Sequence, residues 1–150
     1  ILKDHGFIKL GFYSELARQH IIKARNYISR KKLKANDEDI RQFREAVLTG
    51  ECSELNSLKF STDFYTMSSC RDLCFHAKEH RYSINQLNNI FNKYNLRFLG
   101  FILPKPIKLL YQESYPEDKK QTNLKNWAIF EKNHPNTFSG MYQFWIYKEG

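Results

Sequence analysis

Long apolar runs and glycine-rich loops are both missing from this 150-residue sequence. No segment approaches the roughly 20 consecutive apolar residues that a membrane-spanning helix requires, so we expect no membrane partner. The 150 residues also contain no signal-peptide pattern, no glycine-rich phosphate loop and no RNA-binding signature. The chain therefore offers none of the short motifs that would assign it at once to a membrane or nucleotide-binding class.

Cysteine is scarce as well. The sequence has three cysteines, Cys52, Cys70 and Cys74, which is an odd number and too few for a disulfide framework. Such sparse use suits a reducing compartment better than an oxidising one, so we expect a cytoplasmic protein.

Apolar and aromatic residues are plentiful. Hydrophobic residues make up 41% of the chain and aromatic residues 15%, with 12 Phe and 9 Tyr. This composition predicts one folded domain with a sizeable core. The chain begins at Ile1 rather than Met, and ordered-looking sequence follows within a few residues. We therefore expect it to be part of a longer polypeptide.

Positive charge is concentrated at the start of the chain. The net charge is +8, and residues 1–34 hold nine Lys or Arg against two acids. The favoured interpretation is a solvated helix face that ends in Arg30, Lys31 and Lys32. The alternative is a basic surface for an anionic partner, for which nucleic acid is possible but not favoured.

Periodicity predicts three strands separated by helices. FIKLGFYS (7–14) and MYQFWIYK (141–148) are typical of strands, and RFLGFIL (97–103) is short enough to be a strand buried on both faces. Ser14 is a plausible N-cap for the helix that follows the first strand. The remaining helices are expected to open at Asn36 and end near Gly50, to run from about Ser68 to His80, to open with the Ser83–Gln86 capping box, and to cover 123–133.

Three strands are too few for a self-sufficient layered α/β domain, because helices on both faces need a wider sheet to cover. We expect the missing strands to precede Ile1.

The segment DFYTMSSCRDLCFHAKEHR (63–81) is dense in reactive side chains. Zinc prefers ligands such as Cys70, Cys74, His76 and His80. On one continuous helix, however, the cysteine pair and the histidine pair point to different sides, about 120° apart around the axis, so one ion cannot gather all four. Asp72, His76 and His80 do share a face, which leaves a weaker possibility of a metal site with two histidines and one carboxylate.

Two further interpretations of this segment stay open. Cys70 beside Arg71 at the start of a helix is a candidate thiolate nucleophile, although no orienting third residue can be assigned. Alternatively, Cys74 belongs to the core while Arg71, Asp72 and Glu79 form surface ion pairs of little energetic weight.

Several strings together resemble the C-terminal half of a bacterial family of class I S-adenosylmethionine-dependent methyltransferases, often fused to tetratricopeptide repeats. The matching strings, in the order of that family, are LKDHGFIKLGFYSELAR (2–18), DIRQFR (39–44), DFYTMSSCRDLCFHAKEHR (63–81), LRFLGF (96–101) and NHPNTFSGMYQFWIYK (133–148).

The resemblance implies a Rossmann-like α/β fold. Residues 1–14 would supply a turn and the fifth strand of a seven-stranded sheet, although His5 replaces a common glycine in that turn. Residues 15–95 would form a helical insertion that serves as a substrate lid. Residues 96–150 would supply strand six, a helix, and strand seven, antiparallel and inserted between five and six.

The resemblance also implies an acceptor pocket, which is a further interpretation of the dense segment. Its expected lining residues are Tyr13, Ser14, Arg18, Asp63, Tyr65, Arg71, Asp72 and Arg81. His76 or His80 is the candidate catalytic base, because histidine titrates near neutral pH. Arg18, Arg71 and Arg81 would alternatively bind an acidic acceptor.

The implied activity is methyl transfer from S-adenosylmethionine to an unknown acceptor, with tetratricopeptide repeats as a possible part of the same full-length chain. The residues that bind the cofactor are expected upstream of Ile1, so we expect the 150-residue piece alone to be inactive. The alternative from a different class is a non-catalytic binding or regulatory module whose basic first helix contacts an anionic partner.

Overall fold

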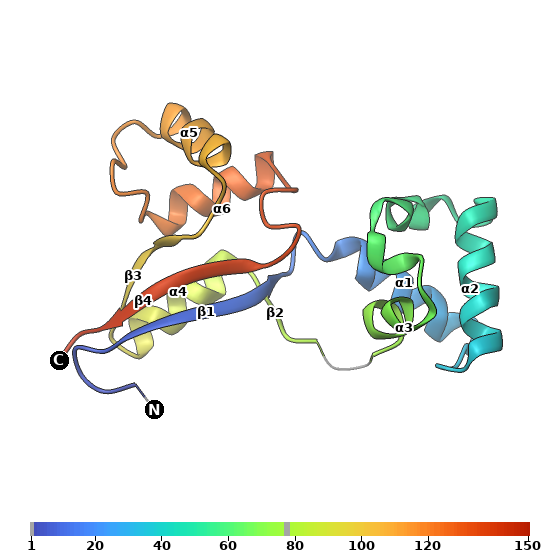
Figure 1. Ribbon diagram of the computed structural model, residues 1–150. Helices are drawn as coiled ribbons and strands as arrows, with labels where there is room; N and C mark the ends of the chain where they lie inside the picture. Colours follow the sequence, from blue (N-terminus) through green and yellow to red (C-terminus); the bar gives the residue numbers. More distant parts are fainter. Residues whose placement is uncertain (1, 77–78) are drawn as a thin grey trace. The chain divides into compact units, whose positions relative to one another are not determined.

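The computed structural model describes residues 2–76 and 79–150, and these divide into two compact units (Figure 1). Residues 2–17 and 80–150 form an α/β unit, called here the sheet unit. The second unit, called the helical unit, spans residues 18–79. The helical segment expected over 15–95 is thus divided, because residues 80–95 pack with the sheet.

The sheet unit holds a four-stranded mixed sheet. Its strands are β1 (Phe7–Ser14), β2 (Arg81–Tyr82), β3 (Leu96–Phe101) and β4 (Tyr142–Lys148). Their order across the sheet is β2-β1-β4-β3, with β2 parallel to β1 and β4 antiparallel to both β1 and β3 (Figure 1). The three long strands were predicted from the sequence, and β2 was not.

Helices α4 (Ile84–Lys93), α5 (Lys105–Ser114) and α6 (Leu124–Asn133) complete the sheet unit. The core is largely aromatic, and Phe144 of β4 lies at its centre, 5.5 Å from Phe91 and 5.9 Å from Phe98 between ring centroids. Residues of β4 alternate, so that Phe144 is buried while Trp145 is 44% exposed. On the same outer face, Phe7 of β1 is 62% exposed. The described residues therefore bury one face of the sheet more fully than the other.

The prediction that the segment 97–103 is buried on both faces was wrong. Arg97 and Leu99 are exposed, because β3 is an edge strand with one face on the core. A register shift between Phe98 and Gly100 adds a bulge, and Gly100 adopts a φ of +127° there. This bulge lets both Phe98 and Phe101 face the core although three positions separate them.

Helix starts follow their local capping signals. Ser83 and Gln86 form the predicted capping box at α4. The Asn123 side chain accepts hydrogen bonds from the amides of Lys125 and Asn126 at the start of α6. Helix α5 was not predicted from the sequence, in which Pro104 and Pro106 follow directly after the strand-like segment 97–103. Here they open a helix, where a missing amide hydrogen costs nothing.

The helical unit contains α1 (Gln19–Arg30), α2 (Asp37–Thr49), η1 (Ser53–Phe60), η2 (Thr62–Phe64), α3 (Met67–Cys70) and the π-helical turn η3 (Arg71–Phe75). Helix α2 confirms its prediction, since Asn36 accepts a hydrogen bond from the Asp39 amide and Gly50 closes the helix at a φ of +79°. Its core includes Phe43, which contacts Tyr27 of α1 and Phe75 of η3.

Two predictions about helix ends need correction. The helix expected from about Ser68 to His80 ends at Phe75, since η3 widens the last turn and His76 is already extended. Residues 77 and 78 of that predicted helix lie outside the described part of the chain. The Ser14 hydroxyl accepts a hydrogen bond from the Ala17 amide at 3.0 Å, but α1 begins only at Gln19, so Ser14 closes a turn rather than capping the helix.

Candidate functional site

A buried polar cluster lies at the carboxyl end of β1. The Ser14 hydroxyl donates to the Glu131 carboxyl of α6 at 2.5 Å. The Tyr142 hydroxyl, at the first residue of β4, lies 2.8 Å from each oxygen of the same carboxyl group. Ser14 and Glu131 are the two polar or charged residues among the described ones that are fully buried. We call this group the Ser14–Glu131–Tyr142 cluster.

Strand topology brings these three residues together. Because β4 runs antiparallel to β1, its first residue lies beside the last residues of β1, and the register pairs Phe12 with Tyr142. Helix α6 presents Glu131 from the same face as Trp127, one helical turn earlier, so the acid points into the core. The cluster thus joins the end of one strand, the start of another and a helix that covers them.

Burial dominates the electrostatics of the cluster. Desolvation raises the pKa of Glu131 above its ordinary value, while the hydrogen bonds from Ser14 and Tyr142 act in the opposite direction. Burial likewise raises the pKa of the Tyr142 phenol. Within the described residues no Lys, Arg or His forms an ion pair with Glu131. A carboxyl group in this setting holds its proton to a higher pH than an exposed one, and loss of that proton would change the hydrogen bonding of both hydroxyls.

Three of the predicted acceptor-pocket residues meet beside this cluster. Strand β2 pairs in parallel with the end of β1, so that Tyr13 lies opposite Arg81 and Ser14 opposite Tyr82. The Glu15 amide donates to the Tyr82 carbonyl at 3.0 Å and extends the pairing by one residue. The structure therefore brings Tyr13, Ser14 and Arg81 to one edge of the sheet unit. His80, a candidate base, directly precedes this pair of strands and is exposed.

The other predicted residues belong to the helical unit, where they make separate local contacts. Arg71 donates to Asp37 at 2.7 Å, and the Tyr65 hydroxyl donates to the Lys59 carbonyl at 2.8 Å. Asp63 lies exposed in η2. Arg18 forms an ion pair with Glu79 at 3.5 Å. These contacts hold the unit together and do not by themselves assemble a pocket.

The second candidate base, His76, lies on the surface. Its Nε2 lies 3.2 Å from the Asp72 carboxylate, and the side chains of His76 and Asp72 are 69% and 72% exposed. The face predicted for Asp72, His76 and His80 does not form, because the helix ends at Phe75. In the described part of the chain, no group of three or more His, Cys, Asp or Glu residues is arranged to hold a metal ion.

The two helical cysteines are core residues. Cys70 and Cys74 are both buried, and the hydrogen bond between their thiols raises the pKa of Cys74, with desolvation adding to the rise. The candidate nucleophile is Cys70, and the hydrogen bond with the Cys74 thiol lowers its pKa. Cys70 is nevertheless fully buried, so its sulfur is closed off from a substrate, and this burial does not favour the thiolate interpretation.

The basic start of the helical unit is partly balanced by acids. Arg30 lies 3.7 Å from Glu54, and Lys31 lies 3.5 Å from Glu51. These exposed pairs reduce the positive field that the sequence suggested for an anionic partner.

Glu131 and Tyr142 were missed as functional residues by reasoning from the sequence. A usable signal existed for Glu131, because it follows Leu124 by seven residues and Trp127 by four, which is the spacing of one apolar helix face. An acid on the buried face of a helix requires hydrogen-bond partners from neighbouring elements, so its presence there indicates a buried polar cluster.

Comparison with known proteins leaves the geometry as the main guide to function. Neither a family model nor a curated protein matches this chain. Among the described residues, the helices are all too short or too polar to cross a membrane.

Proposed function

We propose that this chain is the C-terminal part of an S-adenosylmethionine-dependent methyltransferase and that it supplies residues of the acceptor pocket. The supporting observation is the strand order β1-β4-β3, in which the C-terminal strand runs antiparallel between two strands of common direction. The methyltransferase resemblance implies this same arrangement for strands five, seven and six. In chain order the last strand, β4, is inserted between the two earlier strands β1 and β3, and this connection is what supports the assignment.

The open edge of β1 also supports the proposal. Strand β2 pairs with β1 only at Tyr13 and Ser14, so within the described residues positions 7–12 have a strand neighbour on one side alone. An edge with free amides and carbonyls is a template for another strand. In the proposed enzyme, the strands that cradle the cofactor continue the sheet from this edge.

The chemistry asked of this part of the enzyme is modest. Methyl transfer is an in-line displacement, in which the acceptor attacks the methyl carbon and the sulfonium leaves as a thioether. The protein orients the acceptor and removes its proton where the acceptor carries one. Tyr13, Ser14 and Arg81 lie at the carboxyl end of β1, the end at which open α/β sheets place their ligands.

Within this proposal Glu131 is a positioning residue. Its carboxyl group accepts a hydrogen bond from the Ser14 hydroxyl and so fixes the position of that hydroxyl. The Ser14 hydroxyl also accepts from the Ala17 amide, which stabilises the turn after β1. His76 or His80 remains the proposed base for acceptors that must lose a proton, with Arg18, Asp63, Tyr65, Arg71 and Asp72 as further proposed contacts from the helical unit.

Calorimetry with S-adenosylmethionine tests the proposal. We expect a longer polypeptide that includes the residues encoded before Ile1 to bind the cofactor with micromolar affinity, and the 150-residue chain alone to bind it far more weakly. Micromolar binding by the 150 residues alone, or none by the longer chain, would contradict the assignment. Replacement of His76 and His80 together by Gln should lower kcat; unchanged turnover removes both from the mechanism.

A further inference from the structure

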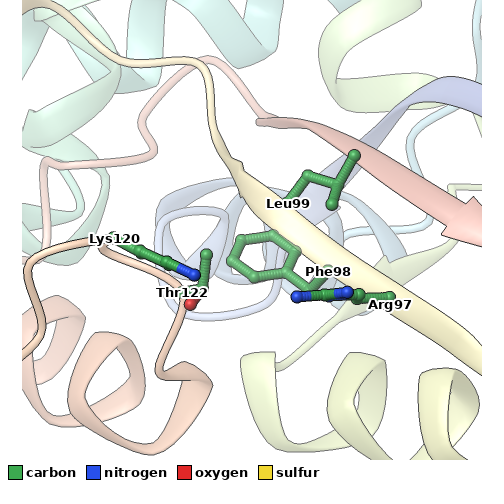
Figure 2. A pocket seen from close by; sticks show the side chains of 5 residues that line it. All are labelled: Arg97, Phe98, Leu99, Lys120 and Thr122. Carbon is green, nitrogen blue, oxygen red and sulfur yellow. The ribbon is translucent and has the colours of Figure 1, made fainter.

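A hollow of about 410 Å³ lies beside the edge strand β3 in the sheet unit. None of its lining residues belongs to the Ser14–Glu131–Tyr142 cluster. Its lining residues are Arg97, Phe98, Leu99, Lys120 and Thr122. Figure 2 shows the side chains of Arg97 and Lys120 extending toward each other from opposite sides of the Phe98 ring, with Thr122 next to the end of Lys120. Two cations and a hydroxyl therefore converge on one space.

Hydrogen bonds fix the loop that carries Lys120 and Thr122. The Asp118 carboxylate accepts from the Tyr111 hydroxyl at 2.6 Å and from the Thr122 amide at 3.1 Å. The Gln121 carbonyl accepts from the buried Trp127 indole at 2.8 Å, and Gln121 itself adopts a φ of +55°. The backbone of the loop is consequently anchored to α5 and α6, which fixes the positions from which the exposed Lys120 side chain and Thr122 extend.

The polar groups of the hollow lack partners within the protein. Across residues 2–76 and 79–150, neither Arg97 nor Lys120 has an ion pair, and the Thr122 hydroxyl has no hydrogen bond. Asp118, an acid of the same loop, already accepts hydrogen bonds from the Tyr111 hydroxyl and from the amides of Thr122 and Asn123. Two cations that approach each other without a carboxylate between them favour an anion in the space.

We propose that this hollow binds the phosphate group of a small organic phosphate ester. A guanidinium presents paired N–H donors that match phosphate oxygens, and an ammonium and a hydroxyl complete the oxygen contacts. The volume exceeds what one oxyanion needs and falls in the usual range of roughly 300–1,000 Å³ for small-molecule sites. Phe98 and Leu99 provide an apolar wall for the organic part of the ester. The inference does not depend on the proposed methyltransferase function.

Nuclear magnetic resonance titration with phenyl phosphate tests the proposal, with inorganic phosphate as the second ligand and ionic strength held constant. We expect saturable shifts centred on Arg97, Lys120 and Thr122, and tighter binding of phenyl phosphate than of inorganic phosphate. The variants Arg97→Gln and Lys120→Gln should each weaken binding about tenfold, because each removes one charge-assisted contact.

Lys132→Gln is the matched control, since it removes an exposed positive charge of α6 outside the hollow. Circular dichroism of each variant shows whether the fold is intact. Absence of saturable shifts, equal weakening by Lys132→Gln, or equal affinity for the two phosphates would overturn the proposal. Tighter binding of a single-stranded oligonucleotide through the same residues would also overturn it and assign the hollow to nucleic acid.

Discussion

The two units of this protein bury polar groups in different ways. The sheet unit places a carboxyl group in its interior and satisfies it with two hydroxyls, and it leaves one edge and one face of its sheet sparsely covered. The helical unit instead pairs a largely buried acid with cations, because the Glu79 side chain is 9% exposed and lies 3.5 Å from Arg18 and 3.3 Å from Arg25. A unit built from helices satisfies its backbone locally, whereas a sheet must find neighbours. Among the described residues, the sheet unit is therefore the part that offers unpaired strand edge to further contacts.

The largest expected effects come from the aromatic cores. Phe144→Ala should cost about 4 kcal/mol of unfolding free energy in the sheet unit, because it leaves a cavity among several rings. Phe43→Ala is the matched change in the helical unit and should cost a similar amount there. Hydrogen exchange should show each loss confined to its own unit. Equal loss of protection in both units would contradict the division.

The Ser14–Glu131–Tyr142 cluster should give the next largest effect. Glu131→Ala leaves two buried hydroxyls without their acceptor, so we expect a loss of about 3 kcal/mol in chemical denaturation. Glu131→Gln retains one carbonyl acceptor and should recover a large part of that loss. If the two variants are equally destabilised, hydrogen bonding is not what Glu131 contributes.

The pH dependence of stability sharpens the same comparison. Because burial raises the folded-state pKa of Glu131 above its ordinary value of 4.5, the folded state retains the proton more strongly than the unfolded state does. Its contribution is therefore fully present below pH 4.5 and is lost as the pH rises through the folded-state pKa. The stability of the wild type relative to Glu131→Gln should fall over that interval. A difference between the two proteins that does not change with pH would exclude a raised pKa.

Capping residues allow a matched comparison between the units. Asn36→Ala removes the cap of α2, and Ser83→Ala removes half of the capping box of α4. Each should cost about 1 kcal/mol in its own unit. Thermal unfolding followed with a probe in each unit measures the two losses. A loss near zero at either site would show that the packing of that helix, and not its cap, determines where it starts.

The smallest effect is expected at the exposed His76. His76→Gln removes a contact with Asp72 in which both side chains are mostly exposed to solvent, so stability should change by less than about 0.5 kcal/mol. A loss above about 1 kcal/mol in denaturant titration would show that His76 makes contacts that matter for folding.

Signals that act over a few residues allowed much of this fold to be predicted from sequence. The alternation in 7–14, the Asn36 and Ser83 caps and the aromatic strand near the C-terminus all act locally, and each element formed as expected. Helix α5 was missed because prolines such as Pro104 and Pro106 are typical both of the end of a strand and of the start of a helix.

The candidate site was harder to predict because its parts are distant in sequence. Ser14 and Glu131 are separated by 117 positions, and only the antiparallel course of β4 brings their elements together. The segment 63–81 misled for a related reason. Its helix ends in a π-helical turn at Phe75, so a face extrapolated to His80 along an ideal helix does not exist.

Amide hydrogen exchange along β1 is the most direct test of the proposal that the sheet continues beyond this strand. The account predicts that in the 150-residue chain alternate amides among residues 7–12 exchange rapidly, while those that face β4 are protected. In a longer chain that supplies the neighbouring strand, both sets should be protected. Full protection of both sets in the monomeric 150-residue chain would contradict the account.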